Sequence, residues 1–236
     1  MDVILQNALP VEMQAETFLP GVAPCAPDDW LRVDEVYGTQ MAYRSRLLAE
    51  RGAEVLHSDA GDAEQEVLDE VLALLPTLGF EVGAESVLCP DGRRVALDRG
   101  APLFTLGHLV QQDICVLQKR GDQHVLTGAV LCFPANWRLA DKVGRPLTAI
   151  HTPVDEYTDD IARRVQRLFD GIKAGRPLWR FNRLHYATGE LHQPGGRVKA
   201  GTMPYLRAER QCLIRLPQTQ AVVFAIHTFF VLRDGE

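Results

Sequence analysis

Residues 205–232 read YLRAERQCLIRLPQTQAVVFAIHTFFVL, and this stretch decides the fold. It contains two runs rich in β-branched, aliphatic and aromatic residues, at 205–216 and 221–232. The polar tetrapeptide Pro-Gln-Thr-Gln separates them. Two such runs on either side of a short turn are typical of an antiparallel β-hairpin. We therefore expect the chain to end in a long hairpin within a β-sheet.

The segments before this hairpin alternate between strands and helices. Residues 178–186 predict a third strand, and residues 103–117 and 124–133 predict an earlier hairpin. Between the strands over 124–133 and 178–186, we expect a short helix over 136–143 and an amphipathic helix over 158–172. Two strands, a helical crossover and three strands is the order of a PAS-type sheet, whose crossover helices enclose a ligand cavity. The sequence therefore predicts an α+β fold with a PAS-like, antiparallel five-stranded sheet.

The first hundred residues have a different character. Residues 1–30 contain four prolines and are expected to form an extended arm, followed by helices over 28–50 and 62–78. We therefore divide the chain into an N-terminal arm and helical extension at 1–100 and a sheet domain at 101–236. Together the two parts are expected to form one compact unit.

Composition excludes several classes of protein. The net charge of −6 argues against nucleic acid as the main partner, because phosphate binding needs a basic surface. The N-terminus lacks the basic start of a signal peptide, and no apolar run approaches the ~20 residues that span a membrane. Five cysteines without a C-x-x-C pair are typical of reduced thiols in the cytosol. We expect a cytoplasmic protein that binds neither nucleic acid nor a membrane.

Of the seven histidines, His151 has the most unusual context. It lies in GRPLTAIHTPV, residues 144–154, where two prolines stiffen a loop between the two crossover helices. An imidazole on a rigid loop facing an apolar pocket can serve as an axial haem ligand. The structural alternative is a loop histidine that bonds the backbone.

The other histidines are interpreted by context. His57 and His124 have polar neighbours and are expected at the surface. His108 and His227 lie in expected strands, where they would be core or cavity-wall groups. No H-E-x-x-H motif or close His/Cys cluster is present in the sequence, which argues against a zinc site.

Several segments, in order from about residue 30 to the end, resemble the haem-dependent oxidative N-demethylase family. They are VDEVY (33–37), RLL (46–48), QDICVL (112–117), CFPANW (132–137), GRP to IHTPV (144–154), GRPLWR (175–180), LRAERQ (206–211) and RLP (215–217). The sequence departs from the family pattern beside the expected pocket at Asp155, Glu156 and Arg183, so the resemblance does not name the substrate.

The resemblance implies that 101–236 is a PAS-like domain binding haem b. Such a protein would use dioxygen to demethylate a small methylated amine oxidatively and release formaldehyde. Electrons would come from a separate flavin and iron–sulfur reductase, in agreement with the absence of a G-x-G-x-x-G motif from this sequence. Two alternatives stay open: a PAS-type haem sensor of gas or redox state without catalytic activity, and an interaction subunit that has lost haem. Oligomerisation also stays open.

The resemblance makes His151 the first candidate for the iron ligand, and a cationic amine then needs a negative partner. Glu209 is the first candidate, either to hold the ammonium or to relay protons. Strand alternation places Arg207 and Glu209 on one face and Arg210 on the other. Arg207 or Arg210 could instead bind a haem propionate, and the structural alternative for Glu209 is an Arg–Glu cross-strand pair.

Further candidates for the pocket follow from the same resemblance. Tyr157 and Trp137 would lie near the substrate or the haem, although Trp137 could equally be a core aromatic residue. Arg145 and Arg176 precede prolines at loop ends, where they could bind propionates or face solvent.

Overall fold

The computed structural model describes residues 3–14, 21–150, 159–195 and 201–233, without the side chains of 159–162. The large sheet is formed by β1 (Ala23–Pro24), β2 (Leu56–Ser58), β6 (Asp113–Arg120), β7 (Gln123–Val130), β8 (Leu178–Tyr186), β9 (Tyr205–Arg215) and β10 (Val222–Leu232). A small sheet comprises β3 (Glu81–Val82), β4 (Ser86–Leu88) and β5 (Arg94–Ala96). The helices are α1 (Tyr37–Val55), α2 (Asp62–Leu74), α3 (Pro102–Leu109), α4 (Leu147–Ile150) and α5 (Asp159–Gly171), with 3-10 turns η1 (Val11–Met13), η2 (Leu75–Leu78) and η3 (Leu139–Asp141).

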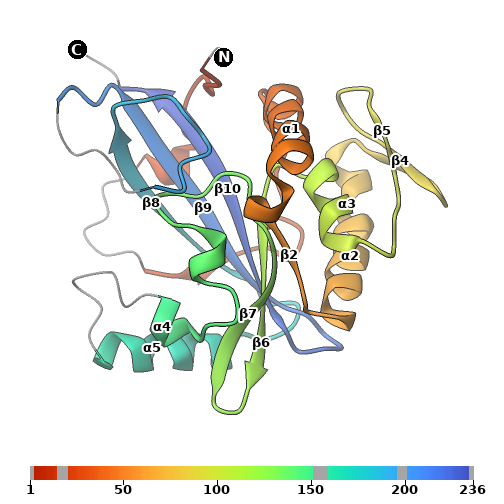
Figure 1. Cartoon of the computed structure of the whole chain (residues 1–236), viewed down its shortest axis with the longest axis vertical. Helices are drawn as coiled ribbons and strands as arrows, with labels where there is room; N and C mark the ends of the chain where they lie inside the picture. Colours follow the sequence, from red (N-terminus) through yellow and green to blue (C-terminus); the bar gives the residue numbers. More distant parts are fainter. Residues whose placement is uncertain (1–2, 15–20, 151–158, 196–200, 234–236) are drawn as a thin grey trace.

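The large sheet is antiparallel throughout, with the strand order β1-β8-β9-β10-β6-β7-β2. Figure 1 shows α1, α2 and α3 on one side of it and α4 and α5 on the other. The α+β class predicted from the sequence is confirmed. The sheet of the described residues has seven strands rather than the expected five, because the N-terminal part of the chain adds β1 and β2 at its edges.

The terminal hairpin forms where the sequence predicts it. β9 and β10 pair along their whole length, and β8 pairs with β9 on the other side. Helix α2 holds the turn between β9 and β10. The Glu66 carboxylate of α2 accepts hydrogen bonds from the backbone N–H groups of Gln218 and Thr219, at 2.6 and 2.8 Å. The predicted helix over 62–78 is also confirmed, as α2 followed by η2, and it ends at Gly79, whose φ is 86°.

The predicted strand over 103–117 is wrong in its first half. Residues Pro102–Leu109 form α3, and the strand β6 begins only at Asp113. A continuous apolar run does not distinguish a buried strand from a buried helix, because neither has an exposed polar face to set the period. Pro102 occupies the first turn of the helix, where its missing N–H costs nothing. At Gly107 a Cβ would lie 2.8 Å from Leu48, so only glycine allows this approach to α1.

Two other predicted elements differ. The helix expected over 28–50 begins only at Tyr37, because the Asp34 carboxylate bonds the N–H of Val36 and holds the preceding segment in an irregular path. The helix expected over 136–143 is reduced to the single turn η3. Asn136 enters this segment with a left-handed backbone, φ 65°, which a helix cannot contain. No helix of the described ranges is long and apolar enough to cross a membrane.

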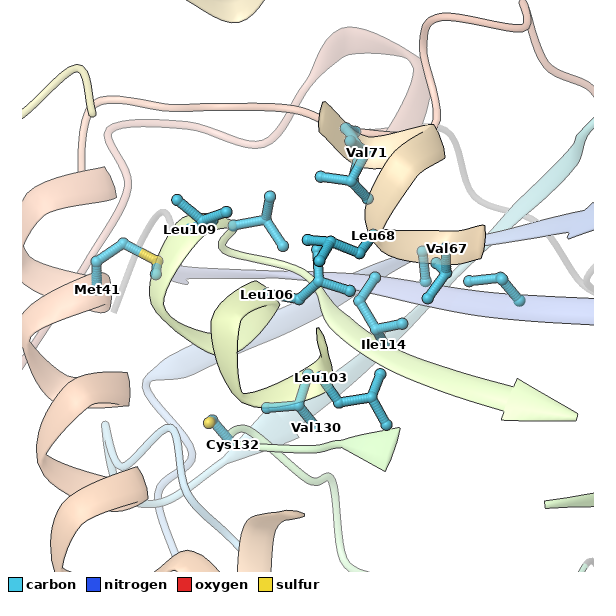
Figure 2. Close-up of a cluster of buried hydrophobic side chains, with 14 of the residues drawn as sticks. Met41, Val67, Leu68, Val71, Leu103, Leu106, Leu109, Ile114, Val130 and Cys132 are labelled. Carbon is cyan, nitrogen blue, oxygen red and sulfur yellow. The ribbon is translucent and has the colours of Figure 1, made fainter. Parts of the chain in front are cut away.

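The two faces of the sheet bury separate cores. In Figure 2, Leu106 of α3 lies between Leu68 of α2 and Ile114 of the sheet. Leu103 lies near Val130, and Leu109 lies on the side of Met41. On the opposite face, Phe169 and Ile172 at the end of α5 pack against Leu213 and Ile226. Alternation along β9 sends Cys212 and Ile214 to the first core and Leu213 to the second. We call the face under α5 the crossover face.

Candidate functional site

Polar side chains from three neighbouring strands gather on the crossover face beyond the apolar cluster under α5. Register places Asn182 of β8 and Thr228 of β10 on either side of Glu209 of β9, and Arg180 beside Gln211. We call this set the polar belt; its members are Arg180, Asn182, Arg207, Glu209, Gln211 and Thr228. Alternation along β9 places Arg207, Glu209 and Gln211 on the face of Leu213, which packs in the α5 core. Figure 1 shows α4 and α5 on this side of the sheet.

The Glu209 carboxylate is the centre of the belt and is 6% exposed. Its Oε1 accepts from Nη2 and Nε of Arg207 at 3.0 and 3.2 Å. Its Oε2 accepts from the side-chain amides of Asn182 and Gln211 at 3.1 and 3.0 Å. One oxygen is therefore fixed by a buried ion pair within its own strand. The other meets only neutral amides of half-buried residues, which an incoming cation could replace.

Arg207 shares the face of Glu209, as strand alternation predicts, and its guanidinium is fully occupied by the protein. Besides Glu209, it donates to the carbonyl oxygens of Leu191 and Phe133 and to the hydroxyl of Thr228. It also lies over the ring of Tyr186, 5.9 Å from the centroid. Its donors therefore hold Glu209 and the neighbouring loops in place.

Arg180 differs from every other member of the belt. Within the described part of the chain it makes no hydrogen bond or ion pair, and its Nε is completely buried without a partner. Burial lowers the pKa of its guanidinium, and the nearby Glu209 charge opposes that shift. An unpaired, largely buried guanidinium suits an anionic ligand such as a carboxylate, because Arg binds carboxylates in a two-pronged geometry.

Arg180 was missed by sequence reasoning, although the sequence carries a signal for it. It stands two residues before Asn182 on β8, and alternation places both on the face of Glu209.

The predicted site residues His151 and Tyr157 lie outside the described residues.

Among the described histidines, His192 has the arrangement of a potential metal ligand. Its Nδ1 lies 2.7 Å from the carbonyl oxygen of Cys132, so Nδ1 donates and the buried Nε2 keeps its lone pair. The adjacent Leu191 carbonyl binds Arg207, which places this loop beside the polar belt. A buried guanidinium and an imidazole nitrogen with an available lone pair are thus both present among the described residues, and the chemistry of these groups suits a haem propionate and a haem iron.

His192 is a residue that sequence reasoning missed. Its flanking residues carry no periodic pattern, and only the contact with Cys132, 60 residues earlier, selects its tautomer.

Two of the predictions for other histidines are wrong. His124 is not at the surface: it is buried on β7 against Phe169, and burial lowers its pKa. Its Nδ1 contacts the Gln166 side-chain amide at 2.9 Å, so Nε2 carries the proton. His108 lies on α3 rather than on a strand and contacts Ser45.

The prediction for His227 is confirmed: it is a core group on β10. Both of its ring nitrogens are used, one by Gln112 at 2.8 Å and one by Asp34 at 3.0 Å.

The remaining predicted residues do not join the belt. Arg210 points to the opposite face of the sheet, as alternation predicts, and forms an ion pair of 2.8 Å with Asp29. Trp137 packs beside the α5 core with Lys142 over its ring, as a core aromatic residue does. Arg145 and Arg176 are exposed. The structure thus brings Arg207 and Glu209 together and keeps Arg210 apart from them.

The chain matches the model of a known protein family. The model of one family, described as haem-dependent oxidative N-demethylase, alpha subunit-like, matches residues 21–233. The match runs from just before β1 into the residue after β10, so it includes the whole large sheet, the crossover and the polar belt. The chain belongs to the haem-dependent oxidative N-demethylase, alpha subunit-like family.

Proposed function

We propose that this chain is a haem-binding subunit that oxidatively demethylates a small methylated amine. It uses dioxygen and electrons from a separate flavin and iron–sulfur reductase, and it releases formaldehyde. Family membership over residues 21–233 is the observation that carries this proposal. Haem supplies the oxygen chemistry, while the protein provides binding, orientation and electrostatics. The alpha subunit-like description of the family supports a reductase partner.

The topology supports a PAS-like origin for the haem domain. The five central strands run β8-β9-β10-β6-β7, formed by a hairpin, a helical crossover and a three-stranded meander. In such a sheet the ligand lies between the crossover and the sheet, on the face that carries the polar belt. The two short edge strands leave this central arrangement unchanged.

Glu209 is the residue we assign to the amine. A protonated amine can take the place of the neutral amides of Asn182 and Gln211 at Oε2, because a charge-assisted hydrogen bond is about twice as strong as a neutral one. Arg207 holds Oε1 at the same time, so the carboxylate keeps its orientation while Oε2 binds. Once the amine is bound, Glu209 can accept its ammonium proton at Oε2.

The haem contacts follow from the unsatisfied groups. We assign His151 as the iron ligand from its family motif and Arg180 as the partner of a propionate. His192, whose Nε2 is buried with a free lone pair among the described residues, is the second candidate for the iron. Its loop adjoins Arg207, so haem and amine would meet over the same part of the sheet.

The test uses the purified full chain after reconstitution with haem. We expect an intense Soret band that His151→Ala abolishes and the matched variant His57→Ala keeps. With reductant, reductase and dimethylamine, we expect formaldehyde release in step with amine loss. Absence of haem uptake would overturn the proposal. Haem binding without turnover on a panel of methylated amines would reject the enzyme in favour of the haem sensor.

A further inference from the structure

Two cysteines, an arginine and an aspartate form a second polar cluster on the opposite face of the sheet. Arg210 Nη1 lies 3.0 Å from Sγ of Cys212, and its Nη2 lies 3.3 Å from Sγ of Cys25. The same Nη2 donates to Asp29 at 2.8 Å. The ring of Trp179 covers the guanidinium at 5.2 Å. One cation therefore holds two sulfur atoms, contributed by residues at opposite ends of the chain.

The two thiols differ in access and in acidity. Cys25 is half-buried, whereas Cys212 is 1% exposed. A hydrogen bond from Cys212, reinforced by Arg210, lowers the pKa of Cys25 to about 7 although burial and the Asp29 carboxylate both raise it, and the same bond raises the pKa of Cys212. Since the thiolate is the nucleophile, Cys25 is the reactive and accessible member. The buried Cys212 is placed to react with it second.

The backbone around Cys25 is anchored lightly. Cys25 follows β1, a two-residue edge strand that pairs only with β8, and its N–H bonds the carbonyl of Pro177 at 2.9 Å. Cys212 lies within β9, between β8 and β10. A disulfide needs an S–S bond of about 2.05 Å. Because β8 lies between β1 and β9, the segment after β1 must bend over β8 on the face where both sulfur atoms contact Arg210, which is easier than moving β9 out of the sheet.

We propose that Cys25 and Cys212 form a peroxide-responsive thiol pair that closes to a disulfide. The Cys25 thiolate attacks hydrogen peroxide: an S–O bond forms, the O–O bond breaks, and the leaving hydroxide takes a proton to become water. Cys212 then attacks the sulfenic sulfur. The S–S bond forms, the S–O bond breaks, and the hydroxide leaves as water with the Cys212 proton. Two thiols are oxidised by two electrons, and one peroxide is reduced to two waters.

This site is independent of the proposed haem chemistry, because it lies on the other face of the sheet and includes no residue of the polar belt. Cys89, Cys115 and Cys132 serve as internal comparisons. They are buried, and burial raises the pKa of each thiol. They are therefore expected to resist peroxide.

The test treats the full chain with equimolar hydrogen peroxide, blocks the remaining thiols under denaturing conditions, and maps the peptides without reduction. We expect a single cross-link between Cys25 and Cys212, reversed by dithiothreitol. It should be lost in Cys25→Ser and kept in the matched variant Cys115→Ala. A different pairing, or oxidation that stops at the sulfenic acid, would overturn the proposal.

A second measurement keeps the test independent of folding in the variants. In the unmodified chain, the rate of alkylation of Cys25 by iodoacetamide should rise with a midpoint near pH 7, well below the value of about 8.5 for an ordinary thiol. A midpoint at the ordinary value would remove the basis for selective oxidation at this cysteine.

Discussion

The two faces of the sheet differ in how completely their buried charges are paired. On the side of α1–α3, Arg44 is completely buried and donates to Asp113 at 2.6 Å and to the carbonyls of Gly107, Gln111 and Gln112. Asp113 in turn accepts the N–H groups of Cys132 and Phe133. This cluster joins α1, the exit from α3 and the end of β7. The charged groups of this cluster are hydrogen-bonded within the protein, so the cluster stabilises the fold.

The polar belt on the crossover face is arranged differently. Arg180 has no partner among the described residues, and Oε2 of Glu209 meets only neutral amides. Burying an unsatisfied charge costs free energy that a purely structural cluster avoids. We therefore interpret the satisfied charges of the Arg44–Asp113 cluster as structural, and the unsatisfied groups of the polar belt as available to a ligand.

The largest effect is expected at Asp113. Asp113→Ala leaves the Arg44 charge buried without compensation and removes the acceptor for two N–H groups, so we expect a loss of about 3–5 kcal/mol in the free energy of unfolding. Urea denaturation measures it. The matched control is Asp69→Ala, which breaks the exposed pair with Arg99 and should cost less than about 1 kcal/mol. Equal losses in the two variants would contradict a structural role for the Arg44–Asp113 cluster.

Glu209→Gln tests the polar belt on the crossover face. It keeps the shape of the side chain but removes the negative charge, so the amine loses its partner. We expect kcat/KM for the amine to fall about 100-fold, which corresponds to about 2.7 kcal/mol. The Soret band should be retained, and unfolding should be affected less than in Asp113→Ala. Glu85→Gln, at an exposed position, is the control. Turnover equal to that of the parent chain would remove Glu209 from the site.

Arg180→Met should separate stability from binding. The variant removes a largely buried charge that has no hydrogen-bond partner in the described part of the chain, so the haem-free chain should keep its stability or gain up to about 1 kcal/mol. Haem titration should show affinity about tenfold lower, because the propionate partner is lost. Arg176→Ala, an exposed arginine near the same strand, should change neither quantity. A clear loss of stability in Arg180→Met would instead make this arginine structural.

The smallest expected effect is the pH dependence of folding stability contributed by Asp34. Burial raises the pKa of Asp34, but hydrogen bonds from His227, Gln6 and Gln111 outweigh it and hold the pKa at about 2. A carboxyl with a depressed pKa stabilises the fold above its unfolded value near 4, and this stabilisation is lost as pH falls toward 2. About 1 kcal/mol should disappear between pH 6 and pH 3. Asp34→Asn should remove that part of the pH dependence of the free energy of unfolding measured by urea titration; an unchanged pH dependence would contradict the assignment.

Local pattern was sufficient for much of this protein. Composition and periodicity predicted the strands β8, β9 and β10, the helix α2 and the alternation that separates Arg207 and Glu209 from Arg210. These features depend on residues a few positions apart, whose side chains point to fixed sides of a strand or helix. The order of the motifs also led to the family, which the match over 21–233 confirms.

Only the tertiary structure decided the rest. It turned the apolar run before Asp113 into the helix α3, and it buried His124 under α5. Among the described residues, it also left Arg180 Nε and His192 Nε2 without a hydrogen-bond partner, and it brought Cys25 to Arg210, 185 residues away. Whether a donor finds an acceptor depends on groups that the chain brings together only by folding. Sequence therefore determined which residues share a face, and the fold determined which of them remain available to react.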